Sequence, residues 1–440
     1  MPYPDTSPFA TARQLQSMLD VEVALAEALA ETGVIPVSSV APIRAAARVD
    51  AYDLAALTAE AAAAGNLLIP LVRHLTRRVA ETDAVAAGHV HWGATSQDVI
   101  DTALVLQLRL AVATVLASLD RAADAAADLA QRHVDTPMAG RTWLQQATPT
   151  TFGAKAAAWL DGLAGARARL ASALDEALVV QLGGATGTLS SLGPAGPAVA
   201  AALAARLELR VSDTPWHTER GRLVAVACAL GMACGTLGKV GRDLALLAQT
   251  EVGEVTEPTA AGRGTSSSMP HKRNPVAAAA AVAAAVQAPG LVATMLAAMP
   301  QEHERALGGW QAEWDTLPAL VDLASRSAAA MAAVMPHLVV HDARMRANLE
   351  ADGGVARAEG LVTALAPRLG HGDALALVGR ACATAAAHGR PLAEVAAEEP
   401  RIRELLDPSA IEQVMAPSGF AGSSRLFVDR VLARWQRASR

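Results

Sequence analysis

The side chains best suited to chemistry gather in TSSSMPHKRNP, residues 265–275, which interrupts two alanine-rich runs. Hydroxyls at residues 265–268 are followed by the cationic stretch 271–273, whose Lys272 is one of only three lysines in the chain. Asn274 and Pro275 have the residue types of a helix N-cap and first helical position. A helix N-terminus attracts anions. The segment therefore predicts a binding loop for an anionic ligand, with a flexible polar linker as the alternative.

A second candidate is HWGATSQD, residues 91–98, where His91, Thr95 and Ser96 precede a glycine- and proline-free run from Val99 to Asp135. Thr95 followed by Asp98 fits a capping box at a helix start. Taken alone, the segment favours a cap beside a turn histidine over a binding site.

A third candidate is GRTWLQQATPTTFG, residues 140–153, where Trp143, Gln145 and Gln146 lie near another predicted helix start. Its alternative is a capped helix with a packed tryptophan. Residues 302–305, Glu-His-Glu-Arg, resemble a metal or acid–base cluster, but adjacent positions on a helix point in different directions. They favour a solvated face, and Arg305 is the expected contact if the segment binds a ligand. The glycine-rich segment 181–193 does not match G-x-G-x-x-G, and no metal-ligand spacing or G-x-S-x-G is present.

Composition excludes several classes. Of the 440 residues, 52% are hydrophobic and 18% charged, which is too apolar for a disordered chain. The net charge of −6 with scattered basic residues argues against nucleic-acid binding. Three cysteines without CxxC spacing indicate free thiols in a reducing compartment. The first 20 residues show no secretory signal.

One uncharged stretch, from Val276 to Pro300, resembles a membrane span. It is mostly alanine and Pro289-Gly290 interrupts it, so we expect a buried core helix with a kink or break. We therefore predict a cytoplasmic protein that contacts neither membrane nor nucleic acid.

The elements that would position these residues are helices. Only 3% of residues are aromatic and alanine recurs in runs, which favours an all-α fold. Besides the run after residue 98, helices are predicted at 14–31, 52–63, 66–79, 150–180, 217–250, 275–298 and 318–335. Several are apolar on every face and must be covered all round. We expect subunits to share a helical bundle, with a monomeric bundle as the alternative.

Shorter helices separated by glycines follow Met345. The predicted organisation is an N-terminal helical domain at 1–98, a central long-helix bundle carrying the loop at 99–345, and a small C-terminal helical domain at 346–440.

Residues 265–275 resemble the signature loop of the fumarase/aspartase superfamily, which usually reads Gly-Ser-Ser-x-Met-Pro-x-Lys-x-Asn-Pro. Ser266 stands at the loop serine and Thr265 where glycine is usual. Segments 91–103 and 140–153 resemble the superfamily's first two conserved regions, and the likeness covers essentially the whole chain. It implies a homotetramer in which each active site draws on three chains.

Within the superfamily, adenylosuccinate lyases typically carry Thr-His-Gly-x-His in the second region, where this chain has Trp143 and Gln146. They also carry His-Asp near the position of Gly65-Asn66. An indole cannot replace a proton-donating histidine. TWLQQATP, QLGGATGTLSSLG, PWHTER and GGWQAEW instead resemble the bacterial 3-carboxy-cis,cis-muconate cycloisomerase family, apart from Gly221 where aspartate is common.

That resemblance implies closure of a tricarboxylate diene to 4-carboxymuconolactone in protocatechuate degradation. The alternatives are a fumarate-releasing elimination lyase of the adenylosuccinate-lyase type and an inactive structural relative. We expect a small polycarboxylate substrate and no cofactor or metal.

Our hypothesis gives proton transfer to Ser266, activated by Lys272 and backbone N–H groups. Lys272 and Asn274 would hold the carboxylate on which charge develops, and Thr95, Ser96 and Arg305 the other carboxylates. His91 would orient the substrate and Trp143 would press on the diene. The predicted catalytic residues are therefore Ser266, Lys272 and His91. The predicted binding residues are Thr95, Ser96, Trp143, Gln145, Ser267, Asn274 and Arg305.

Overall fold

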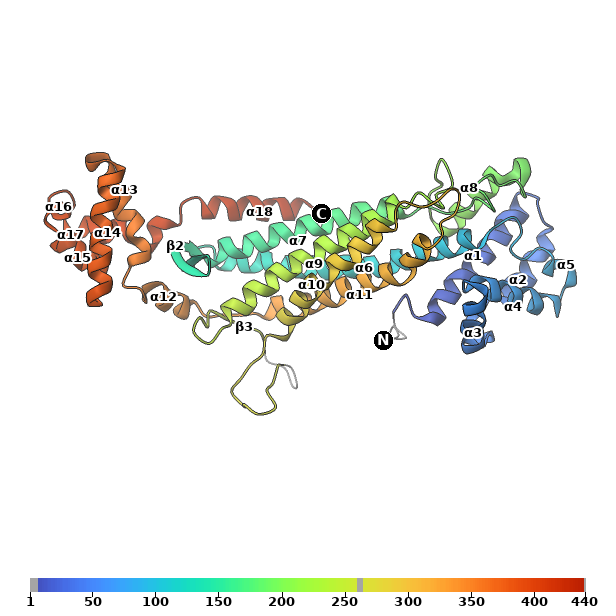
Figure 1. Ribbon diagram of the computed structural model, residues 1–440, viewed down its shortest axis with the longest axis horizontal. Coiled ribbons are helices and arrows are strands. Elements are labelled where there is room, and N and C mark those ends of the chain that lie inside the picture. Colours follow the sequence, from blue (N-terminus) through green and yellow to red (C-terminus); the bar gives the residue numbers. More distant parts are fainter. Residues whose placement is uncertain (1–6, 259–263, 439–440) are drawn as a thin grey trace. The chain divides into compact units, whose positions relative to one another are not determined.

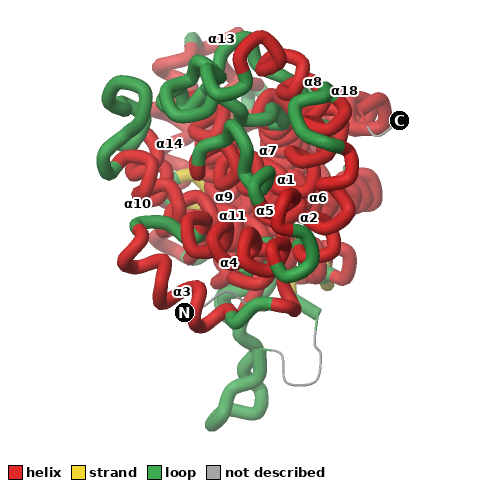
Figure 2. Tube along the Cα trace, turned by 90° about the vertical axis from the view of Figure 1, so that its right-hand side faces the viewer, coloured by secondary structure: helices red, strands yellow, loops and turns green. Residues whose placement is uncertain are grey.

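A computed structural model describes residues 7–258 and 264–438, and helices make up most of them (Figure 1). The described strands are two short antiparallel pairs, whereas helices dominate the trace (Figure 2). The predicted all-α class is confirmed.

Five long helices correspond to the predicted alanine-rich runs. Their bounds are α6 (Ser96–Arg132), α7 (Phe152–Ala177), α9 (Gly221–Leu247), α10 (Val276–Ala297) and α11 (Gly309–Val334). Alanine and leucine are strong helix formers, so runs rich in them stay helical over many turns even where α7, α9, α10 and α11 include a glycine or proline.

Two of these helices contain a proline. α10 continues through Pro289, so of the predicted kink or break the break is wrong. Pro289 has no N–H to donate to the Ala285 carbonyl, so α10 continues with one helical hydrogen bond fewer. α11 begins at Gly309, not at Pro318. Its first turns are held by buried side-chain bonds of Trp310 and Glu313, which outweigh the hydrogen bond that proline removes.

The described chain divides into two compact units, and each long helix contributes residues to both. Unit 1 comprises residues 1–117, 166–235 and 284–326, and unit 2 comprises 118–165, 236–283 and 327–440. The three-domain division at residues 98 and 345 stays a prediction.

Unit 1 adds shorter helices from the N-terminal region to its parts of the long helices. These are α1 (Thr11–Glu31), α2 (Val40–Ala46), α3 (Leu54–Ala64), α4 (Leu68–Ala80), α5 (Ala84–Ala87) and α8 (Gly196–Leu207). α1 packs against α8 and buries Leu15, Leu19 and Leu29 completely. Each fully buried leucine contributes roughly 1.5–3 kcal/mol to folding.

Unit 2 contains both strand pairs, β1 (Pro137–Thr142) with β2 (Gln145–Thr151) and β3 (Val255–Thr256) with β4 (Val339–Val340). Its shorter helices are α12 (Asp342–Glu350), α13 (Ala358–Leu369), α14 (His371–His388), α15 (Leu392–Glu398), α16 (Pro400–Arg403), α17 (Pro408–Val414) and α18 (Ser424–Ala438). Helices α13 to α17 surround a separate apolar core that includes Leu361, Leu365 and Leu392.

By length and composition alone, four described helices could cross a membrane: α6, α9, α10 and the run 309–337. In three of them, 61–67% of the most apolar window is buried within the chain, but in α10 only 28% is. The expectation that α10 is a buried core helix is therefore wrong for the single chain. Its alanine-rich surface needs a cover that the described residues do not provide.

A buried charge cluster joins the ends of three long helices in unit 1. Arg220, just before α9, donates to Asp101 on α6 and to Glu313 on α11, at 2.6 Å in each case. All three side chains are almost completely buried. Burial raises the pKa of Glu313, although Arg220 opposes the rise. One guanidinium thus compensates two carboxylates.

Replacing Arg220 should strongly destabilise the protein. Arg220→Met leaves two buried carboxylates without their cation, which should lower the free energy of unfolding by about 3–5 kcal/mol. Denaturant titration at fixed protein concentration measures the change. Arg326→Met, which removes an exposed pair with Asp322, is the control and should change the value by less than ~1 kcal/mol. Equal effects of the two variants would contradict the cluster's role.

Candidate active site

The first two turns of α6 organise the predicted residues of unit 1. The backbone N–H of Thr95 donates to the carboxylate of Asp98 at 2.9 Å. This is one of the two bonds of the predicted capping box. The Thr95 hydroxyl does not complete the box and instead accepts a hydrogen bond from Arg305 at 2.9 Å.

Asp98 is a buried junction between three segments. Its two oxygens also accept the backbone N–H groups of Gly183 and Gly184, each at 2.9 Å. His217 Nε2 lies 2.7 Å from the same carboxylate. A Cβ at Gly183 would lie 2.7 Å from the His217 ring, so only glycine fits there. The glycine-rich segment 181–193 is thus a structural partner of the α6 N-terminus.

Arg305 lies in a bend between α10 and α11, so the helical geometry assumed for residues 302–305 does not apply. Besides Thr95, its guanidinium donates to the carbonyl of Ala185 at 3.1 Å and that of Gly184 at 3.4 Å. Its Nε is buried and has no partner among the described residues. The α6 N-terminus and Arg305 together present positive potential, which suits a carboxylate.

His91 forms a close pair with a residue that sequence reasoning missed. Its Nδ1 lies 2.6 Å from Oε1 of Glu22, a carboxylate of α1 that is only 2% exposed. Burial lowers the pKa of His91, but the charge and hydrogen bond of Glu22 and the charge of Asp98 together raise it above its ordinary value. The His91 backbone has φ +57°, a left-handed conformation uncommon outside glycine.

The signature loop in unit 2 forms a short hairpin. The Asn274 N–H donates to the Gly264 carbonyl at 2.8 Å, and Thr265 bridges to Arg273. Ser266 Oγ accepts the backbone N–H groups of Met269 at 3.1 Å and Ser268 at 3.4 Å. Ser267 and Lys272 are exposed.

The start of α10 differs from the sequence prediction in its cap, and a carboxylate that the prediction did not include lies against it. The anion site itself stays a prediction. The Pro275 carbonyl accepts the first helical hydrogen bond, from Ala279, so the cap is Pro275 and not Asn274. The carboxylate of Glu257 accepts the N–H groups of Ala277 and Ala278 at 3.2 and 2.9 Å. The chain's own carboxylate therefore occupies the positive end of this helix.

Residues 140–151 form most of the β1–β2 hairpin, which the sequence did not predict. The predicted helix start is confirmed, because α7 begins at Phe152. Trp143 and Leu144 occupy its tip, both with positive φ, and Trp143 is 96% exposed. The packed-tryptophan alternative is therefore wrong. Gln145 is also exposed. The hairpin is fixed at its base, because Arg141 donates to buried Glu254 at 2.6 and 2.9 Å.

The structure thus brings together His91, Thr95, Ser96 and Arg305 around the start of α6 in unit 1. In unit 2, Ser266, Ser267, Lys272 and Asn274 share the signature loop, while Trp143 and Gln145 share the hairpin. Sequence reasoning missed Glu22, Glu257 and the roles of Gly183 and His217. For Glu22 the sequence offers one signal: an acidic residue at a position where the pattern of α1 expects an apolar one.

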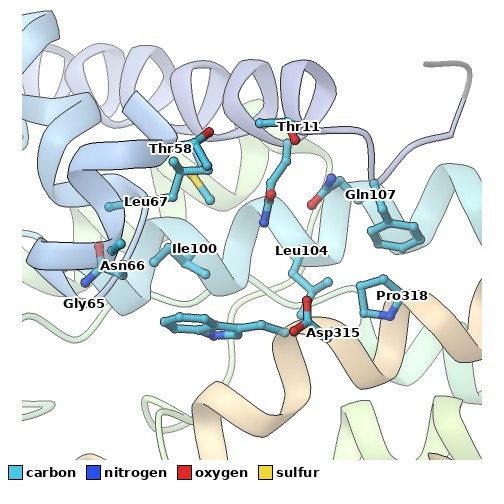
Figure 3. Close-up of a pocket in the computed structure, with 16 residues that line it drawn as sticks. Thr11, Thr58, Gly65, Asn66, Leu67, Ile100, Leu104, Gln107, Asp315 and Pro318 are labelled. Atoms are coloured by element: carbon cyan, nitrogen blue, oxygen red, sulfur yellow. The ribbon is translucent and has the colours of Figure 1, made fainter. Parts of the chain in front are cut away.

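A cavity of about 520 Å³ lies elsewhere in unit 1, and none of the predicted site residues lines it. Figure 3 shows Gly65 and Asn66 toward one end and Gln107 and Pro318 toward the other. Asp315 is the one charged residue of the described lining. Without a cation, this cavity is poorly suited to a polycarboxylate.

Comparisons with known proteins agree with the motifs. The family model described as lyase matches residues 6–290, and that described as adenylosuccinate lyase C-terminus matches residues 354–431. The chain is 50% identical over 433 residues to 3-carboxy-cis,cis-muconate cycloisomerase of Pseudomonas aeruginosa, covering 98% of this chain and 94% of the relative. Nitrosuccinate lyase of Streptomyces davaonensis is 41% identical over 435 residues, 97% of this chain and 92% of the relative.

Among solved structures, the 3-carboxy-cis,cis-muconate lactonizing enzyme of Pseudomonas putida matches with a TM-score of 0.93 at 44% identity. The match covers 98% of this chain and 97% of the other. The resemblance inferred from the loop therefore extends over sequence and fold alike.

Proposed function

We propose, on the premise that this chain belongs to the fumarase/aspartase superfamily of enzymes, that it interconverts 3-carboxy-cis,cis-muconate and 4-carboxymuconolactone. The observation that carries the proposal is the likeness over nearly the whole chain to relatives of that activity. The local chemistry supports it, because Trp143 stands where adenylosuccinate lyases place a proton-donating histidine.

The reaction is internal to the substrate. One carboxylate oxygen forms a C–O bond to a diene carbon, and the carbon alpha to another carboxylate gains a proton. In reverse, loss of that proton leaves negative charge on the carboxylate oxygens. No external acid is needed at the departing oxygen, because it leaves as a carboxylate. The site must therefore move one proton and stabilise charge.

Ser266 is our candidate for the proton transfer. Serine is a weak base, but two backbone N–H groups already point at Ser266 Oγ and would stabilise its alkoxide. Lys272, in the same hairpin, would add positive charge, and Asn274 would bind the carboxylate on which charge develops. Ser267 adds a hydroxyl donor beside them.

The residues at the start of α6 would bind the other carboxylates. Arg305 and Thr95 already share a hydrogen bond, which fixes both groups before substrate arrives. Ser96 adds a hydroxyl in the first turn, and His91 would bind or orient the substrate. Trp143 would press on the diene and Gln145 would donate to substrate.

We further propose that the protein is a cytoplasmic homotetramer acting in protocatechuate degradation. Two observations support an assembly. Val276, Val286 and Leu296 are exposed along α10, and no described residue covers the Trp143 indole at the hairpin tip. Apolar surface of this kind marks contact with another protein surface.

The enzyme should bleach the ultraviolet absorbance of 3-carboxy-cis,cis-muconate, because lactonisation removes one of the conjugated double bonds. No fumarate should appear in a coupled fumarate assay of the same mixture. Release of fumarate from a succinyl-type substrate, with no bleaching of the diene, would instead identify an elimination lyase, which the nitrosuccinate lyase relative keeps as the second candidate. Failure with every substrate would indicate an inactive relative.

Ser266→Ala should lower kcat roughly 10²–10⁴-fold, the usual contribution of a positioned proton-transfer group. Substrate binding, measured by calorimetry, should persist because the carboxylate contacts remain. Ser268→Ala, which keeps its backbone N–H and loses only an exposed hydroxyl, is the matched control. Near-normal turnover by Ser266→Ala would remove this residue from the proposed role.

Val286→Glu should weaken the assembly, because it places a charge on the apolar surface of α10 where Val286 is 70% exposed. Sedimentation velocity should show a shift from tetramer toward smaller species. Val85→Glu, at a comparably exposed valine on α5, should leave the tetramer intact. A monomeric wild-type protein would contradict the proposal directly.

A further inference from the structure

Glu22 is an unusual residue for its place in the fold. The other buried residues of α1 are apolar, among them Leu19, Val21 and Leu25. Burying a carboxylate in such surroundings is costly unless it is paired. One oxygen of Glu22 meets His91 Nδ1 at 2.6 Å, while the other is buried without a partner among the described residues. The pair with His91 is thus the main compensation for this charge.

The hydrogen bond fixes which nitrogen of His91 remains available. With Nδ1 directed at Glu22, the proton sits on that nitrogen in the neutral ring. No hydrogen bond to Nε2 occurs among the described residues. A neutral ring would therefore present a lone pair at Nε2, which repels a carboxylate, whereas an imidazolium would present a charged N–H donor.

The charged groups that face His91 come from two elements. Glu22 approaches from α1 and Asp98 from α6. Asp98 is itself paired with His217 and two glycine N–H groups, so Glu22 provides the closer interaction. Arg305, which contacts Thr95, is the neighbouring cation of the same site. His89 bonds to Ser39 and packs edge-on against Trp92 instead.

We propose that Glu22 is a positioning residue that keeps His91 in its imidazolium form at neutral pH, with Nε2–H directed at a carboxylate of the substrate. The inference rests on the proposed function for its ligand and on the Glu22–His91 geometry for its mechanism. His91 and Arg305 would then supply two fixed cationic donors at one end of the site, matched to a substrate with several carboxylates.

The pH dependence follows from the charge balance. Glu22 and Asp98 raise the pKa of His91 against the opposing effect of burial. The attraction of protonated His91 to Glu22 and Asp98 stabilises the fold fully at pH values where His91 is protonated in both the folded and the unfolded chain. This stabilisation is lost as pH rises through the pKa of His91 in the folded chain. Substrate affinity should fall over that same upper range.

Glu22→Gln removes the charge while keeping the shape of the side chain. KM should rise at least about tenfold at neutral pH, with kcat changed by less than about twofold, because binding rather than proton transfer is affected. Lowering the pH should bring the KM of Glu22→Gln closer to that of the wild-type protein, because His91 then becomes protonated without the help of the Glu22 charge. Glu31→Gln, at an exposed position of the same helix, should behave as wild type.

A direct readout is the titration of His91 in protein labelled with ¹³C at histidine Cε1, assigned with His91→Gln. The His91 titration should move to lower pH in Glu22→Gln. An unmoved titration would overturn the proposal, as would a loss of kcat that is independent of pH. If Glu22→Gln does not fold, the wild-type spectrum decides: a neutral His91 at pH 7 contradicts the inference. Because this titration needs no substrate, it also separates failure of the proposed activity from failure of the pair.

Discussion

The structure of unit 1 depends on two buried carboxylates one turn apart at the start of α6. Asp98 and Asp101 point into the protein, where an uncompensated charge would cost several kcal/mol. Each therefore draws donors from elsewhere in the chain. Asp98 is hydrogen-bonded to the glycine-rich segment and to His217. Asp101 accepts hydrogen bonds from Arg220 and Trp310. The need to neutralise these two groups fixes how the surrounding segments meet.

This requirement explains why the polar residues of the site are held so firmly. Asp98 closes the turn through the Thr95 N–H, which aims the Thr95 hydroxyl at Arg305. The same carboxylate fixes Gly184, whose carbonyl, with that of Ala185, also receives Arg305. Arg305 is thus oriented by groups that are themselves oriented by Asp98. Such preorganisation lowers the entropy lost when a carboxylate ligand binds.

The sequence predicted the long helices well because runs rich in alanine and leucine favour helix and are poor in the β-branched and aromatic residues that strands prefer. It also indicated the signature loop and the start of α6, whose residue types lie close together in the chain. It could not reveal Glu22 beside His91, because the two are 69 positions apart. The β1–β2 hairpin was missed for a local reason: a Trp-Leu tip lacks the Asn-Gly or Asp-Gly signature of such turns.

The tip of the β1–β2 hairpin is strained and exposed, which suggests a role outside the stability of its own chain. Consecutive positive φ values at Trp143 and Leu144 cost roughly 1–3 kcal/mol each, and neither side chain is buried in return. The base of the hairpin is nevertheless anchored by the buried Arg141–Glu254 pair. The strained, exposed conformation of Trp143 therefore does not stabilise its own chain. The strain is understandable if the indole serves a binding surface completed by another copy, as the shared active site of the proposed tetramer requires.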